Sequence, residues 1–75
     1  MAEDEFVRIE VGLDGGQILS WLVTPPSADA LERALNAGDA GAVTLDAQDG
    51  HIHLALPRVL YAKRFLREGR VGFEV

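Results

Sequence analysis

The sequence predicts an α+β fold: a small antiparallel sheet of four to six strands with one short helix packed on one face, in the order ββαββββ. Three observations lead to this prediction. Several segments alternate apolar and polar residues with a period of two, which is typical of half-buried strands. Glycine-containing turn sequences separate these segments. A single stretch before Gly38 has the spacing of an amphipathic helix.

The length and composition favour one domain that self-associates. The chain has 75 residues and no repeat or linker, so we expect a single domain over residues 6–75 after a flexible acidic tail at residues 1–5. Cysteine is absent, which excludes disulfides, thiolate nucleophiles and cysteine-ligated zinc. Nearly half of the residues are apolar, and a core this small stabilises a fold by only about 3–5 kcal/mol. Association of copies would bury the excess apolar surface.

The first two strands are predicted from residues 6 to 13 and from residues 17 to 24. In the first, the alternation is regular, whereas the second has apolar residues on both of its faces, including Trp21. The turn between them, Asp14-Gly15-Gly16, has glycines that accept positive φ. A strand that is apolar on both faces is usually covered on both sides. We therefore expect either that a partner subunit covers one face or that a monomer exposes an apolar patch.

The helix is predicted to follow Pro25-Pro26, which cannot continue a strand. Ser27 or Asp29 is the expected cap, and Asp29 with Glu32 has the spacing of a capping box. Gly38 is expected to end the helix in a left-handed conformation. About ten residues cannot hold a helix alone in water, so its apolar side must pack on the sheet. That side carries Leu31, Ala34 and Leu35.

The second half of the chain predicts four further strands. One begins at Gly41, and the turn Gln48-Asp49-Gly50 leads into a return strand over residues 51–56. An extended segment over residues 59–66 is expected next, with Val59, Tyr61 and Phe65 on one side. A helix over residues 58–68 is the alternative, because Leu60, Arg64 and Arg67 also suit a period of 3.6. A turn at residues 67–70 and a last strand at residues 71–75 complete the prediction.

The charge distribution indicates an interaction surface. Residues 1–57 hold two basic and ten acidic residues, a formal charge of −8, whereas residues 58–75 hold five basic and two acidic residues, a formal charge of +3. An asymmetry of this kind favours binding of a partner. Trp21 is a candidate interface anchor, with core filling as its alternative role. The predicted partner-binding residues are Trp21, Arg58, Lys63, Arg64, Arg67 and Arg70.

Three explanations of the basic stretch remain open. The side chains can protect an exposed edge strand from further pairing, or form ion pairs within the protein or its oligomer. They can bind an acidic protein partner. They can also bind nucleic acid, since Tyr61 and Phe65 alternate with them as stacking platforms do. The net charge of −5 opposes the nucleic-acid interpretation.

Metal binding and catalysis have weak support in the sequence. His51 and His53 project from the same side of a strand, and Asp46 or Asp49 could add an oxygen ligand. A zinc site normally uses three or four protein ligands, so we expect two solvent-exposed histidines and no metal or cofactor. No nucleophile stands beside a candidate base, and the glycines at residues 15 and 16 are not followed by the lysine of a phosphate loop.

The sequence therefore predicts a cytoplasmic bacterial domain that acts by binding rather than by catalysis. The expected role is a non-enzymatic protein-interaction or regulatory module that forms a homo-oligomer, with no membrane association. A nucleic-acid-binding module that uses the basic C-terminal stretch is the alternative.

Overall fold

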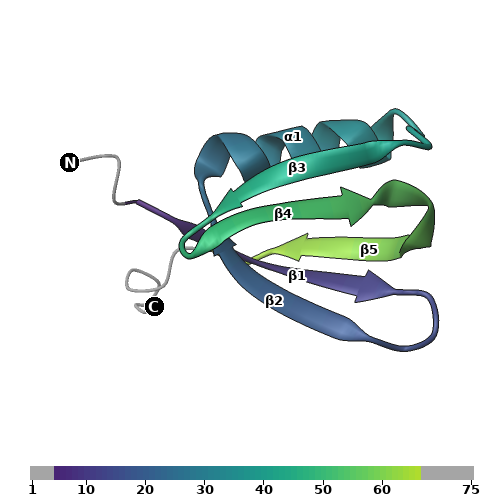
Figure 1. The fold of residues 1–75 in the computed structure, drawn as a ribbon, viewed down its shortest axis with the longest axis horizontal. Helices are drawn as coiled ribbons and strands as arrows, with labels where there is room; N and C mark the ends of the chain where they lie inside the picture. Colours follow the sequence, from purple (N-terminus) through teal and green to yellow (C-terminus); the bar gives the residue numbers. More distant parts are fainter. Residues whose placement is uncertain (1–4, 67–75) are drawn as a thin grey trace.

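A computed structural model describes residues 5–66 and shows one antiparallel five-stranded sheet with one helix (Figure 1). The α+β fold predicted from the sequence is confirmed. The elements in chain order are β1 (Val7–Leu13), β2 (Ile18–Val23), α1 (Pro25–Asn36), β3 (Ala42–Ala47), β4 (Gly50–Ala55), a 3₁₀ turn (Leu56–Arg58) and β5 (Val59–Arg64). The predicted turn at residues 67–70 and the last strand at residues 71–75 lie outside the described residues, as do residues 1–4 of the predicted tail.

The strand order is β4-β3-β2-β1-β5, so the first strand of the chain lies between β2 and the last described strand. A single bridge, Val23 to Ala47, joins β2 to β3. The sheet bends at this corner, and the β3–β4 hairpin diverges from β2 beyond it (Figure 1). The molecule thus has a three-stranded part, β2-β1-β5, and a two-stranded part, β3-β4.

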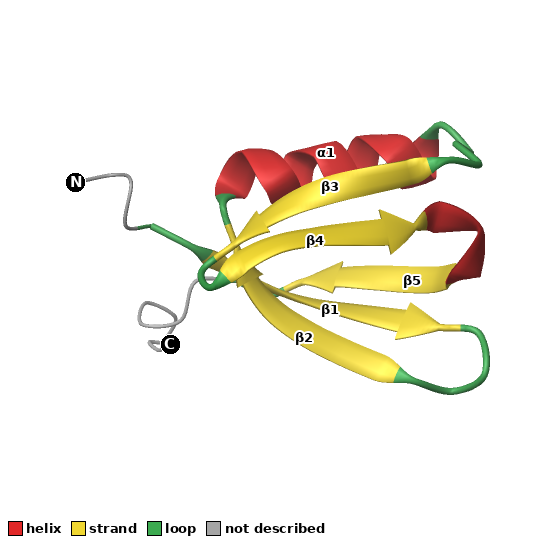
Figure 2. Ribbon diagram, in the orientation of Figure 1, coloured by secondary structure: helices red, strands yellow, loops and turns green. Residues whose placement is uncertain are grey.

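The core fills the space between α1 and the two parts of the sheet. The helix lies along β3 on one side of the sheet (Figure 2) and contributes Ala28 and Leu31. Alternation along the strands supplies most of the rest, because every second side chain points to the helix side, and the 3₁₀ turn adds Leu56. The buried apolar residues are Ile9, Val11, Val23, Ala28, Leu31, Leu45, Leu54 and Leu56.

The helix begins earlier than the sequence predicted. Thr24 is the N-cap, its Oγ1 accepts a hydrogen bond from the Ser27 N–H at 3.3 Å, and Pro25 and Pro26 form the first turn. Proline is favoured there because its fixed φ suits the helix and the first N–H groups have no partner within the helix. The expected caps, Ser27 and Asp29, are therefore residues inside the helix. The predicted end is confirmed, with Gly38 at φ 70° just after the last turn.

Residues 59–64 form a strand, so the helical alternative for this segment is wrong. β5 pairs antiparallel with β1, and the register shifts between Gly12 and Leu13. This irregularity pairs Val59 with Leu13 and packs Val59 against the core, whereas Tyr61 points to the opposite side of the sheet. The prediction that Val59 and Tyr61 share a side was wrong, because a bulge shifts the alternation by one residue.

In the described part of the chain, no helix combines the length and the apolar character that a membrane span requires.

Candidate interaction surface

The side of β2-β1-β5 that faces away from α1 forms a continuous surface, which we call the outer face. The strand register arranges it in three rows. Each row takes one residue from β2, one from β1 and one from β5 or the residue that follows it. The rows are Leu22, Arg8 and Phe65; Ser20, Glu10 and Lys63; and Ile18, Gly12 and Tyr61.

Large apolar side chains on the outer face are exposed. Ile18 has 61% of its surface accessible, Leu22 has 40% and Tyr61 has 42%. The apolar residues of β2 that the sequence placed on a second face are therefore uncovered in the single chain. Several exposed large apolar side chains on one face of a small protein are typical of a contact site.

Tyr61 lies flat on the sheet because Gly12 has no side chain. A Cβ added at Gly12 would come within 2.1 Å of the Tyr61 ring. The Tyr61 hydroxyl donates a hydrogen bond to Glu10 Oε2 at 2.7 Å. This bond, with smaller contributions from desolvation and from the negative charge of Glu10, raises the pKa of Tyr61 above the ordinary tyrosine value. The phenol thus stays protonated and holds the Glu10 carboxylate toward β5.

Two cations lie against the ring of Phe65 on the same face. The Arg8 guanidinium carbon is 4.7 Å from the ring centroid, and Lys63 Nζ is 4.6 Å from it. Both distances are within the range of cation–π attraction. The positive groups therefore gather over β5, beside an aromatic ring.

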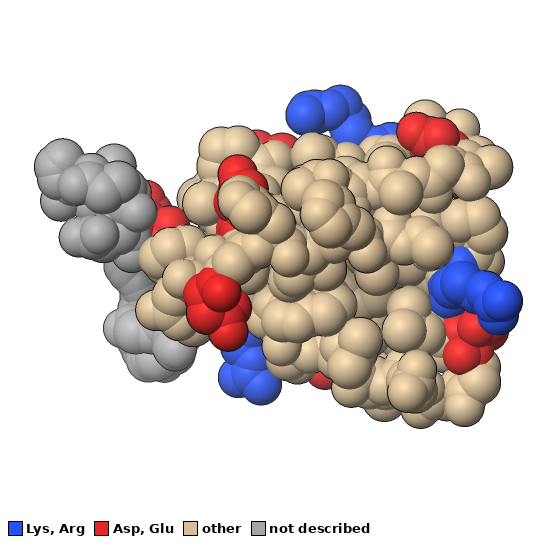
Figure 3. Space-filling model, viewed as in Figure 1, with Lys and Arg blue, Asp and Glu red and all other residues tan. Residues whose placement is uncertain are grey.

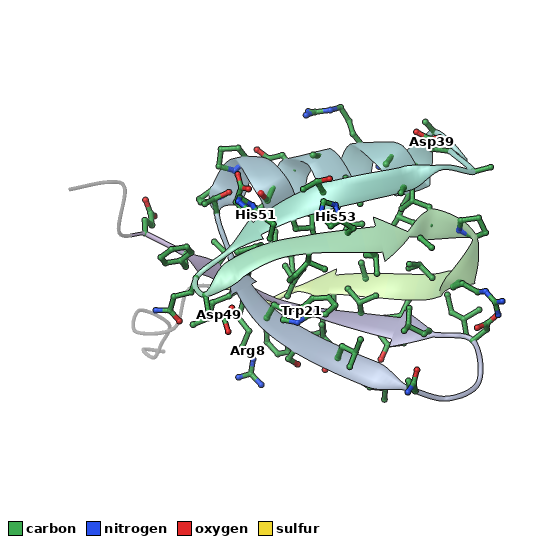
Figure 4. All side chains as sticks on the ribbon, in the orientation of Figure 1. Arg8, Trp21, Asp39, Asp49, His51 and His53 are labelled. Atoms are coloured by element: carbon green, nitrogen blue, oxygen red, sulfur yellow. The ribbon has the colours of Figure 1, made fainter. Side chains whose placement is uncertain are left out.

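An open groove of about 970 Å³ borders one end of the outer face. Its lining includes Arg8, Leu22 and Phe65 of the outer face together with Trp21 and Asp49. Trp21 pairs with Ile9, projects to the core side and is half-buried against the core. In Figure 4, Trp21 lies between β4 and β2, whereas Arg8 extends away from the strands. Trp21 is thus a core residue at the margin of the groove, and its role as an interface anchor stays a prediction.

The basic residues predicted as one binding stretch are dispersed. Arg58 pairs with Asp14 at 3.3 Å, beside the first turn. Arg64 points to the helix side, where it contacts Asp29 at 2.7 Å and Glu32 at 3.5 Å. Lys63 lies on the outer face, and Arg67 and Arg70 lie outside the described residues. Basic side chains stand at separate places around the rim of the view in Figure 3.

Arg64 has an intramolecular role in this arrangement. The hydrogen bond from its guanidinium to Asp29, followed by the charges of Asp29 and Glu32, raises the pKa of Arg64 despite partial desolvation. Within residues 5–66, β5 is an edge strand of the sheet, and the expectation that basic residues at an edge pair with acidic residues is supported by Arg64. Both acidic partners of Arg64 belong to α1.

The two histidines lie on the exposed side of β4. His51 Nδ1 is 2.9 Å from Asp46 Oδ1, and His53 Nδ1 is 3.1 Å from the Thr44 hydroxyl. Among residues 5–66, no group of three or more potential ligands is placed to hold a metal ion. Each imidazole is instead paired with its cross-strand neighbour on β3.

Sequence reasoning did not include Arg8 or Glu10 among the predicted partner-binding residues. The signal for Arg8 and Glu10 was the alternation of the first strand, which placed them opposite the core. What the sequence lacked was the pairing of β1 with β5, which sets these residues beside Tyr61, Lys63 and Phe65. A scan against protein-family models found no match, and searches of curated proteins and of solved structures found no significantly similar protein.

Proposed function

We propose that this protein is a non-enzymatic protein-interaction module that self-associates and binds through its outer face. The observation that supports the proposal is the exposure of Ile18, Leu22 and Tyr61 on one side of a three-stranded sheet. A chain of 75 residues has a small core, and apolar side chains that stay in water do not add to its stability in a monomer. Association removes them from water at about 25 cal/mol per Å² of apolar surface.

The charges of the outer face suit a protein partner. Arg8 and Lys63 stand beside Glu10, so positive and negative groups alternate within one surface. Charged groups of both signs in an interface fix the orientation of the two proteins and disfavour partners whose charges do not match. They contribute less to the affinity itself. Aromatic residues and arginine, which are enriched in protein interfaces, occur together on this face as Tyr61, Phe65 and Arg8.

Nucleic acid is the second candidate, and one observation favours it. Arg8, Lys63 and the aromatic rings of Tyr61 and Phe65 share an open sheet face, as in single-strand binding platforms. Against it, Glu10 stands in the centre of the face, Arg58 and Arg64 are engaged with acidic side chains, and the net charge is −5. We therefore rank it below protein binding.

Sedimentation equilibrium tests the proposal. We expect the wild type to associate at tens of micromolar, and Leu22→Glu to shift it to monomers, because burying an unpaired carboxylate opposes contact. Ala40→Glu adds the same charge at an exposed loop after the helix and should associate like the wild type. A monomeric wild type together with salt-sensitive binding to a single-stranded oligonucleotide would instead support the nucleic-acid function.

A further inference from the structure

β2 has an open edge over most of its length, where the β3–β4 hairpin diverges from it (Figure 1). Its only bridge to β3 is at Val23, so within the described residues no strand lies beside residues 18–21 on that side. The Leu22 carbonyl points to this side, because it accepts the Gln48 N–H at 2.9 Å. Backbone groups alternate in direction along a strand, so those of Ser20 point to the same side. An open strand edge of this kind is a template on which a further strand can pair.

The faces of β2 are exposed beside this edge. Leu19, on the core side, has 37% of its surface accessible, and Ile18, on the outer face, has 61%. The groove of about 970 Å³ lies at the same strand. Its lining takes Ser20 and Leu22 from the outer face and Trp21 from the core side, so the groove extends around the edge of β2. A strand added at this edge would cover side chains on both faces.

The described part of the chain leads into this groove. The Phe65 N–H donates to the β1 backbone at 2.9 Å, and both Phe65 and Leu66 contribute to the groove lining. The sequence continues for nine more residues. The strand position beyond β2 lies three strand spacings from β5, a distance of about 14 Å. Five Cα steps from Leu66 to Val71 span up to about 17 Å, so residues 67–70 are long enough to cross.

We propose that residues 71–75 pair with the open edge of β2 and close the groove from within the same chain. β5 runs parallel to β2, because both are antiparallel to β1. Phe65 and Leu22 accordingly lie at the same end of the sheet. A segment that crosses there and then turns toward Ile18 runs antiparallel to β2, the orientation that a short connection allows.

The apolar pattern of this segment suits the position. Val71, Phe73 and Val75 share one side of an extended segment, whereas the residues between them are glycine and glutamate. With its apolar side toward the core, the added strand covers Leu19 and Trp21, the core-side residues at the open edge. The glutamate then faces water.

The crossing residues carry charges that the groove can pair. Residues 67–70 include two arginines and one glutamate, and the groove lining includes Asp49 and Arg8. Each sign on the segment has an opposite sign in the groove. The two arginines then act within the chain, as Arg64 does with α1.

Hydrogen exchange at single amides, followed by NMR on the full chain, tests the pairing. The Ser20 N–H points to the open edge, whereas the Trp21 N–H points to β1, where Trp21 is paired with Ile9. We expect the Ser20 N–H to exchange roughly tenfold or more slowly than an unpaired amide. The Trp21 N–H is the internal reference, because β1 protects it in either case.

Phe73→Asp and Gly72→Asp are matched variants. Each adds one carboxylate, the first on the apolar side of the segment and the second on the side that faces water. Phe73→Asp should remove the protection of the Ser20 N–H and shift the fluorescence of Trp21 to longer wavelength, because water then reaches the indole. Gly72→Asp should leave both as in the wild type. Retained protection of the Trp21 N–H shows that the sheet is intact in each variant.

Three results would overturn the inference. Exchange of the wild-type Ser20 N–H at the rate of an unpaired amide would show that the edge stays open. Equal loss of protection in both variants would contradict the alternating placement of the segment. Protection that disappears on dilution would assign the edge to a second copy of the chain. The pairing lies within one chain, so a monomeric wild type would contradict the self-association in the proposed function and leave this inference standing.

Discussion

Gly12 determines the shape of the outer face at the scale of a single residue. It is not among the glycines with positive φ, and the space above it is taken by the Tyr61 ring. Any larger residue would force that ring away from the sheet and break its hydrogen bond to Glu10. Gly12 therefore affects the outer face through the position of the Tyr61 ring, which belongs to β5 and is distant from Gly12 in the sequence.

The ionisation of Tyr61 gives a direct test of this arrangement. Because the protein has one tyrosine, absorbance near 295 nm follows it alone at high pH. We expect Tyr61 to ionise at a higher pH than free tyrosine, whose pKa is about 10. The group stabilises the folded state fully below the unfolded pKa, and this contribution is lost as the pH rises through the higher, folded pKa.

Two variants provide the comparison. Glu10→Gln removes the negative charge and weakens the acceptor, so the pKa of Tyr61 should fall toward its ordinary value. Gly12→Ala should give the same change by displacing the ring. An unchanged titration in both variants would contradict the hydrogen bond as the main cause of the raised pKa.

At the residue scale, the sequence predicted the inward positions well but not the polar partners. Ile9, Val11, Leu45 and Leu54 are buried as alternation implied. The partners of Arg58 and Arg64 could not be predicted, because they depend on which elements become neighbours. Asp14 is 44 positions from Arg58, and Asp29 is 35 positions from Arg64.

At the scale of elements, the helix is attached to the sheet by one buried polar side chain. The Ser27 hydroxyl accepts the Asp46 N–H at 2.8 Å and the Thr24 hydroxyl at 2.9 Å. It thereby connects the first turn of α1 to β3 near the corner of the sheet. Serine at this position looked like a cap in the sequence, because capping residues and residues that bond to a neighbouring strand have the same chemistry.

Replacing this hydroxyl should be costly. Ser27→Ala leaves the Asp46 N–H without its partner, and we expect a loss of about 1–3 kcal/mol in the free energy of unfolding. Ser20→Ala, at the only other serine, removes an exposed hydroxyl on β2 and should change stability by less than about 0.5 kcal/mol. Urea denaturation of both variants measures the difference, and equal stability would show that Ser27 is not a structural link.

The start of the helix shows where element prediction failed. The two prolines were taken to end a strand, and they do follow β2, but they also form the first helical turn. Proline can follow the end of a strand and can also occupy the first turn of a helix. Thr24 is the N-cap in the structure, and its position places the two prolines in the helix. Turns were more predictable: Gly15 and Gly16 have φ near 92° and 91°, as the turn sequence implied.

At the scale of the whole molecule, stability depends on a few aliphatic residues at the junction of the helix and the two parts of the sheet. Leu45 is completely buried there. We expect Leu45→Ala to cost about 2–5 kcal/mol, which is comparable with the whole stability of so small a core. The variant should be largely unfolded at 25 °C when studied at low concentration.

Leu60→Ala is the matched control, because Leu60 is 68% exposed. This substitution should leave the midpoint of thermal unfolding nearly unchanged. Circular dichroism melting curves of both variants provide the measurement. A Leu45→Ala protein that melts like the wild type would mean that the core lies elsewhere.

The fold class was predictable from period-two alternation, one helical segment and the turn glycines, but the strand order was not. Alternation fixes which side of a strand is buried and leaves its neighbours undetermined. The outer face exists only because β5 returns to β1, and nothing local in residues 59–64 specifies that return. The residues of the outer face were thus predicted in part, through β2 and Lys63, and the neighbours on β1 follow from the topology.

The return of β5 to β1 also has a kinetic consequence. Ile9 pairs with Arg64 and Gly12 with Tyr61, so the strand that completes the sheet must close a loop of almost the whole described chain. Local pieces such as the β3–β4 hairpin form with little loss of chain entropy, whereas this closure is slow. We therefore expect the outer face to be the last surface to be assembled, because a chain in which β5 has not reached β1 lacks it.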